Sequence, residues 1–190
     1  LETARGGILR EGLGFDRCDV AVITNIGEGD HLGMNFINTA AELAAVKRVI
    51  VQNVSAEGTA VLNAADPLVA RMARFCTGNV TFFAGQSAAH PVMAKHRAQG
   101  HRVIYRDNGE IIAAQGKAMF RLPLKDIPLT DNGQIAFQVE NVMAAVGAAW
   151  ALDIPWDAIV AGLASFNSDA DTVPGRFNRF DYKGATLIAD

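Results

Sequence analysis

The pattern of hydrophobic and polar positions divides the first half of the chain into alternating strands and helices. Residues 19–25 (DVAVITN), 59–64 (TAVLNA) and 79–85 (NVTFFAG) are short apolar runs, rich in β-branched and aromatic residues. The run at 19–25 lacks polar alternation, which is typical of a strand buried on both faces of a sheet. Longer segments at 38–52 and 67–76 separate the runs, and this rhythm predicts a parallel sheet with helices on its faces.

Both intervening segments carry helix-start signals. Asn38 or Thr39 would cap the first helix, and Glu42 lies in the capping-box position. Pro67 suits the first turn of the second helix, because that turn needs no backbone N–H there. The pattern therefore predicts helices over 38–52 and 67–76.

The middle of the chain has a different pattern. Residues 101–124 contain Asp107-Asn108-Gly109 between two apolar runs, and this is a strong hairpin signal. Gly116 indicates a second turn, so the segment is predicted to be a small antiparallel meander. The predicted fold class is therefore α/β, with a mostly parallel sheet flanked by helices and a small antiparallel meander.

The last third of the chain is predicted to contain two helices, a linker and a hairpin. The hairpin would turn at Lys183-Gly184, where two turn-forming residues separate apolar segments. The helices are predicted at 137–153 and 156–166, the linker at 169–176 and the hairpin at 177–190. Because the chain lacks an initial methionine and stops on a strand-like segment, we expect it to be a fragment of a longer protein, truncated at both ends.

Composition and charge narrow the class of protein. The chain has 190 residues, half of them hydrophobic, which suits one domain. A formal net charge of −3 weighs against a nucleic-acid partner. The longest apolar stretch, 142–152, is too short to span a bilayer, so no membrane segment is expected. Cys18 and Cys76 are interpreted as reduced thiols of a cytoplasmic protein.

The segment TNIGEGDHLG, residues 24–33, directly follows the first predicted strand. Ligands of open parallel sheets bind beyond the carboxyl ends of the strands. Glu28, Asp30 and His31 are plausible ligands of a divalent ion there, and the glycines allow close approach of the backbone. The alternative is a surface loop with solvated charges and a hydrogen-bonded His31.

Lys47 is unusual because it falls on an apolar helical stripe with Leu43, Val46 and Ile50. A buried lysine favours its neutral, reactive amine. The alternative is that the aliphatic stem packs while the ammonium group reaches water. Periodicity alone leaves both interpretations open.

Three further polar residues are weak candidates by themselves. Glu2 precedes a glycine pair. Asn141 is expected in the first turn of its helix, where it could cap the helix or contact a ligand. Arg176 follows the turn VPG, where an arginine is commonly solvated or paired.

Taken together and in order, the segments TNIGEGDHLG, AAVKRVI, VLNAADP, VENVMAA and VPGRF resemble the central ATP-binding domain of the Mur ligase superfamily. The opening LETARGGILREGLGF is most similar to the cyanophycin synthetases within that superfamily. The resemblance implies ATP-dependent amide ligation through an acyl phosphate, with Mg²⁺ neutralising charge on the transferring phosphoryl group. The resemblance to the cyanophycin synthetases implies that aspartate and arginine are joined into a branched polymer, or that a preformed aspartate–arginine dipeptide is polymerised.

The same resemblance assigns roles to single residues. Glu2 and His31 would be magnesium ligands, and Lys47 matches a position that many family members carbamoylate, which would let it hold a second Mg²⁺. His31 and Lys47 would thus serve catalysis. The nucleotide would be contacted by Asn141, Arg176 and Asp190.

The resemblance also implies what lies outside the chain. Residues 1–172 would be the central domain without its phosphate-binding loop, and residues 173–190 the linker and the start of the C-terminal ligase domain. The fragment is therefore expected to be inactive alone, and the loss of a neighbouring strand is expected to cause poor ordering near residues 1–15 or self-association. The parent protein is expected to be a homo-oligomer.

Two alternatives stay open. Another Mur-type ligase would use a peptidoglycan precursor or a folate as acceptor. A degenerate, non-catalytic nucleotide-binding domain is the second alternative, because Ala65 stands where the family commonly has an aspartate.

Overall fold

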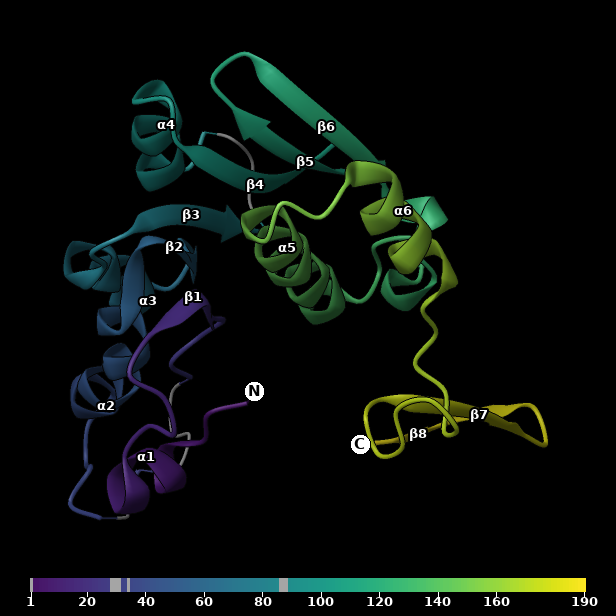
Figure 1. Cartoon of the computed structure of the whole chain (residues 1–190). Helices are drawn as coiled ribbons and strands as arrows, with labels where there is room; N and C mark the ends of the chain where they lie inside the picture. The colour runs from purple at the N-terminus through teal and green to yellow at the C-terminus, as the bar shows by residue number, and fades with distance from the viewer. Residues whose placement is uncertain (1, 28–31, 34, 86–88) are drawn as a thin grey trace.

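The centre of the molecule is a six-stranded sheet whose strands lie side by side in their order along the sequence (Figure 1). The computed structural model describes residues 2–27, 32–33, 35–85 and 89–190. Strands β1 to β4 run parallel, and β4 to β6 form an antiparallel meander. The strands are β1 (Cys18–Ile23), β2 (Val54–Asn63), β3 (Asn79–Ala84), β4 (Arg102–Asp107), β5 (Glu110–Gln115) and β6 (Ala118–Pro123).

Helices cover both faces of this sheet. In β2, Ala60 and Leu62 pack into the core that contains residues of α2, α3 and α4, whereas Val61 between them packs against α5. Alternate residues of one strand point to opposite faces, so a sheet covered on both sides needs apolar residues at successive positions. The helices are α1 (Arg5–Glu11), α2 (Ala40–Gln52), α3 (Pro67–Ala70), α4 (Pro91–Ala98), α5 (Ala136–Ala151) and α6 (Trp156–Ser165), with 3₁₀ turns η1 (Arg71–Phe75), η2 (Leu124–Asp126) and η3 (Pro128–Thr130).

The start of α2 is a complete capping box, as the sequence predicts. The Thr39 hydroxyl accepts the Glu42 N–H at 3.2 Å, and the Glu42 carboxylate accepts the N–H groups of Asn38 at 2.8 Å and Thr39 at 3.0 Å. Thr39 rather than Asn38 is therefore the N-cap. These hydrogen bonds lower the pKa of the Glu42 carboxyl group.

The predicted antiparallel meander is confirmed, and β4 joins it to the parallel strands by pairing with β3. The structure differs from the sequence predictions in three places. The pattern did not predict α1 or α4, although α4 has Pro91 at its start and Gly100 shortly beyond its end. The predicted helix 67–76 is a short α3 followed by the 3₁₀ turn η1. Strand β2 begins at Val54, because a register irregularity between Cys18 and Val20 lets Val54 pair with Cys18.

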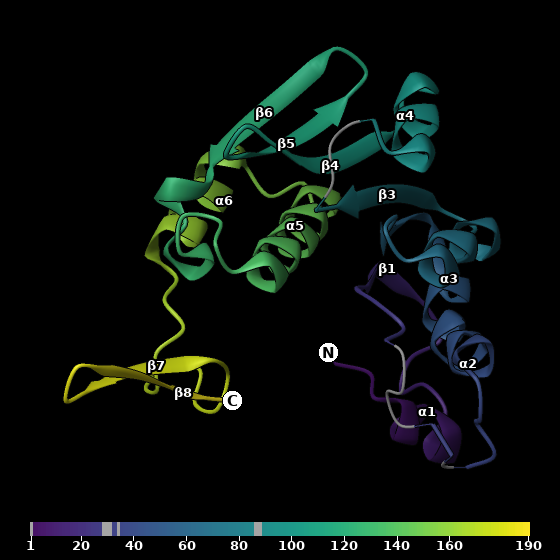
Figure 2. The ribbon, with the colours of Figure 1, turned by 180° about the vertical axis from the view of Figure 1, so that it is seen from behind.

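A second, two-stranded sheet lies apart from the first, at the end of an extended segment after α6 (Figures 1 and 2). It consists of β7 (Asn178–Tyr182) and β8 (Ala185–Ala189), joined at Lys183-Gly184 as predicted. Every residue of this hairpin except Asn178 is exposed. The hairpin therefore contributes little to either apolar core.

Strand β1 is the edge of the six-stranded sheet, so its outer side has no neighbouring strand among the residues described. The expected self-association of the chain stays a prediction. No helix in the described part of the chain is both long and apolar enough to cross a membrane.

Candidate functional site

The candidate site lies where the parallel strands end. Because β1, β2 and β3 run parallel, the residues after them meet at one edge of the sheet. These residues are Thr24–Gly27 after β1, Ala64–Asp66 after β2 and Gly85 after β3. Parts of the sequence motifs that follow β1 and β2 therefore lie close together at this edge of the sheet.

A cavity of about 700 Å³ runs along β1, between the start of the chain, α2 and the end of α5. The polar part of its lining comes from Glu2, Thr3, Arg17, Cys18, Asp19, Thr24, Asn25 and Lys47. Much of the remaining lining is apolar and comes from Val20, Val22, Ile23, Ile50, Ala148 and Leu152. The structure therefore brings together two of the three residues predicted to serve a magnesium site, Glu2 and Lys47.

Lys47 lies on α2 and lines this cavity. Leu43, on the same stripe, is fully buried, whereas Lys47 is half-buried. The Lys47 Nζ atom lies 3.5 Å from the backbone carbonyl oxygen of Asn25. Of the two sequence interpretations, the structure agrees better with a packed stem whose amine reaches polar surroundings.

The prediction for His31 falls outside the described residues, as do those for Glu28 and Asp30. The flanking glycines are described, and Gly27 and Gly33 have φ angles of +37° and +85°. Positive φ at both positions agrees with the predicted need for glycine there.

Asp66, which follows β2, forms a hydrogen bond to the segment that follows β1. Its Oδ1 atom accepts the N–H groups of Leu68 at 2.8 Å and Val69 at 3.2 Å, which caps α3. Its Oδ2 atom accepts the Ile26 N–H at 2.8 Å. The dipeptide Asp66-Pro67 signals a helix start in the sequence, but the contact with Ile26 is tertiary and leaves no sequence pattern.

Asn141 and Glu140 are neighbours on helix α5, but their side chains contact different parts of the molecule. Asn141 lies in the second turn of α5, not the first as predicted, because the helix begins at Ala136. Its side chain donates to Gln138 Oε1 at 3.1 Å and lines an apolar cavity of about 370 Å³ between α5 and α6. Glu140 lies next to Gly85 at the end of β3, and burial raises the pKa of its carboxyl group.

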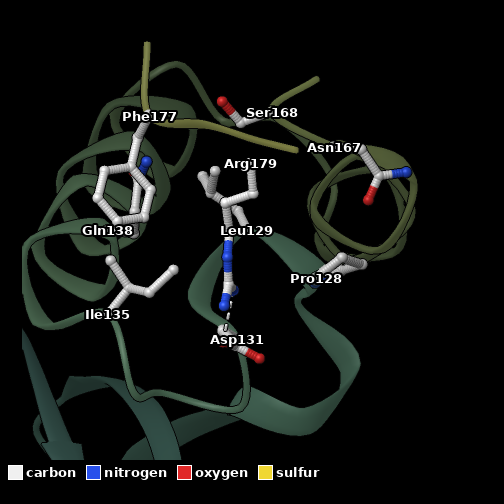
Figure 3. A pocket seen from close by; sticks show the side chains of 9 residues that line it. All are labelled: Pro128, Leu129, Asp131, Ile135, Gln138, Asn167, Ser168, Phe177 and Arg179. Carbon is white, nitrogen blue, oxygen red and sulfur yellow. Dashed lines mark hydrogen bonds and ion pairs between the residues drawn. The ribbon is translucent and has the colours of Figure 1, made fainter. Parts of the chain in front are cut away.

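Arg176 and Asp190 come together near the hairpin, away from Lys47. The Ser168 hydroxyl donates to the Arg176 backbone oxygen, and Asp190 Oδ1 accepts the N–H of Phe177, the next residue, at 3.0 Å. Figure 3 shows a neighbouring pocket in which Arg179 points toward Asp131, at 2.7 Å, beside Phe177 and Gln138. The predicted nucleotide contacts Asn141, Arg176 and Asp190 therefore do not share the cavity of Glu2 and Lys47.

The residues around the β1 cavity partly suit a divalent cation. Among the described residues, no three His, Cys, Asp or Glu side chains form a cluster that could hold a metal. Glu2, Thr24 and Asn25 nevertheless offer carboxylate, hydroxyl and amide oxygens, the ligand type that Mg²⁺ prefers. The donor chemistry fits Mg²⁺, but the described residues supply only part of a coordination shell.

Comparisons with known proteins identify similar sequences and a similar fold. The chain is 42% identical over its whole length to cyanophycin synthetase of Geminocystis herdmanii and 40% identical to that of Crocosphaera subtropica. It spans about 22% of the length of these curated relatives. A solved structure of MurF ligase from Thermotoga maritima in complex with ADP matches 91% of this chain and 35% of its own, with 23% identity and a TM-score of 0.56.

The likeness to MurF at this identity shows a shared fold. The Mur ligase middle domain family matches residues 1–149, which include β1 to β6 and most of α5. This chain belongs to the Mur ligase middle domain family.

Proposed function

We propose that the protein containing this chain is an ATP-dependent ligase that joins aspartate and arginine into a polymer, as its resemblance to the cyanophycin synthetases implies. The observation that supports this most directly is the 42% identity to a cyanophycin synthetase over the entire chain. The acceptor carboxylate would be phosphorylated to an acyl phosphate, and an amine would then displace phosphate. Free amino acids and a preformed aspartate–arginine dipeptide are both compatible with the residues of this chain.

The β1 cavity would be the phosphate end of the site. Glu2, Lys47 and His31 would hold Mg²⁺, whose charge would offset the developing negative charge on the phosphoryl group. Lys47 suits this role only if carbamoylation gives it a carboxylate, because an ammonium group does not bind cations. Its half-buried stem and its amine at the cavity are compatible with that modification.

The other end of the site would bind the nucleoside. Asn141 would contact adenine, and Arg176 and Asp190 would contact the phosphates or ribose. The structure of the MurF neighbour with ADP supports nucleotide binding by this fold. Because Arg176 and Asp190 lie on the segment that leads into the hairpin, we also propose that residues 1–172 form the central domain and 173–190 begin the next one.

The remaining proposals concern the whole protein. It would need the N-terminal and C-terminal parts that its relatives have, so this chain alone would be inactive. It would act in the cytoplasm, in keeping with two free cysteines, and would assemble as a homo-oligomer.

The test is phosphate release from ATP by the longer protein with primer, aspartate and arginine added singly and together. We expect release that requires the amino acids and falls at least about a hundredfold in His31→Ala, as when a charge-stabilising group is removed. His101→Ala is the matched control and should retain activity, because His101 directly precedes β4 and lines a cavity at the starts of β3 and β4. Release with a muramyl or folate acceptor instead would support another Mur-type ligase, and no release from a folded protein would support a degenerate domain.

A further inference from the structure

One peptide group at the candidate site is held at both of its ends by charged side chains. The peptide between Asn25 and Ile26 contributes the Asn25 carbonyl oxygen and the Ile26 N–H. Lys47 Nζ lies 3.5 Å from that oxygen, and Asp66 Oδ2 accepts that N–H at 2.8 Å. A positive group at the carbonyl and a negative group at the N–H both complement the dipole of the peptide.

From this geometry we infer that Asp66 is a positioning residue, which fixes the Asn25–Ile26 peptide and through it the amine of Lys47. Asp66 itself does not line the β1 cavity, whereas Asn25 and Lys47 do. Asn25 also lines a second cavity, of about 480 Å³, together with Ile26 and Asp66. The Asn25–Ile26 peptide thus lies between Asp66 and the β1 cavity.

The surroundings of the peptide make it a rigid link. The Ile26 side chain is 1% exposed, so the residue after the carbonyl is anchored in the core. Asp66 is anchored as well, because its other oxygen caps α3 through Leu68 and Val69. A displacement of the Asp66 carboxylate therefore either breaks the cap or moves the peptide.

An aspartate is required for both contacts at once. Its two oxygens accept from opposite directions, one from the α3 N–H groups and one from Ile26. Asparagine has a single acceptor oxygen and would present an NH₂ group to one of these donors. Serine at this position would still cap α3, but its shorter side chain cannot also reach Ile26.

The consequence for catalysis rests on the proposed function, but the positioning itself can be measured without any activity. The first readout is hydrogen exchange of the Ile26 amide in the longer protein. The second is the rate at which a small acylating reagent, acetic anhydride, modifies Lys47, with the exposed Lys95 of α4 as internal reference. Asn63→Ala is the matched control, because it removes the Asn63 hydrogen bond to Ala65 in the same turn and leaves the contacts of Asp66 in place.

In Asp66→Ser and Asp66→Asn, we expect the Ile26 amide hydrogen to exchange about tenfold faster than in the wild type, because one hydrogen bond to a charged group is lost. Lys47 should also be acylated severalfold faster relative to Lys95. Asn63→Ala should lower the melting temperature without changing either readout. The inference is overturned if both Asp66 variants leave the Ile26 amide and Lys47 unchanged, or if Asn63→Ala changes them equally.

The proposed function and this inference fail in distinguishable ways. If the longer protein releases no phosphate with aspartate and arginine, the ligase proposal fails, while the exchange and acylation results still decide the role of Asp66. If phosphate release is normal in both Asp66 variants while Ile26 exchanges faster and Lys47 is acylated faster, the positioning by Asp66 is supported, and the reaction does not depend on it.

Discussion

At the scale of single residues, Glu140 is a carboxyl group whose ionisation the fold disfavours. It lies on α5 beside Gly85, and burial raises its pKa. Sequence pattern alone does not separate Glu140 from its neighbour Asn141, because both belong to the same motif. Only the packing of α5 against the end of β3 distinguishes them.

The raised pKa of Glu140 predicts that the free energy of unfolding depends on pH. Because the pKa is higher in the folded state, folding favours the protonated form, and the wild type loses stability as pH rises above the ordinary value of 4.5. Glu140→Gln should therefore melt at a higher temperature than the wild type at about pH 7 and at a similar temperature at about pH 4. The exposed Glu57→Gln is the control, and a difference that stays constant across pH would contradict the prediction.

At the scale of elements, the close approach of α5 to the sheet depends on Gly147. A Cβ atom at this position would lie 2.6 Å from Val61 Cγ1 and 3.3 Å from Ile104 Cδ1, both fully buried in the core that α5 covers. Gly162, in α6, would place its Cβ in open space. Gly147 is therefore required for packing and Gly162 is not, although both are single glycines within predicted helices.

Replacing each of these glycines by alanine tests the contact. Gly147→Ala should destabilise the protein by about 1–3 kcal/mol, since a well-packed core must shift. Gly162→Ala should stabilise it by up to about 1 kcal/mol, from helix propensity. Urea denaturation of both variants is the measurement, and equal effects would mean that α5 is free to move away from β2.

Elements were predictable where local chemistry specifies them. The capping box at Thr39 and Glu42 and the turns at Asn108-Gly109 and Lys183-Gly184 follow from a few adjacent residues. The pairing of β4 with β3 and the contact between Asp66 and Ile26 depend on residues far apart in sequence. Sequence pattern named Glu2 and Lys47, and only the fold placed them in one cavity.

At the scale of the whole molecule, the β7–β8 hairpin is held to the rest of the chain by few contacts. Arg179 pairs with Asp131 at 2.7 Å, and the Phe177 ring lies edge-on to Phe137 with centroids 5.1 Å apart. Both members of the ion pair are partly exposed, so it contributes little to global stability. We expect the Arg179–Asp131 ion pair to determine the position of the hairpin instead.

Arg179→Ala should therefore leave the melting temperature nearly unchanged but increase proteolytic cleavage in the segment 167–176. Arg121→Ala is the matched control, since it removes an ion pair with Glu110 of the same 2.7 Å length on the six-stranded sheet. Limited proteolysis followed by mass spectrometry would locate the cleavage. Equal cleavage in the two variants would mean that the ion pair does not hold the hairpin.

The order of the six strands has a consequence for how the molecule is made. In the described part of the chain, each strand pairs only with the strands next to it in sequence, from β1 to β6. Once β1 is in place, each of β2 to β6 can therefore join the open edge of the sheet as it leaves the ribosome, without insertion between two of these strands that are already paired. Most loop closures are correspondingly short, which favours rapid folding of this sheet during synthesis.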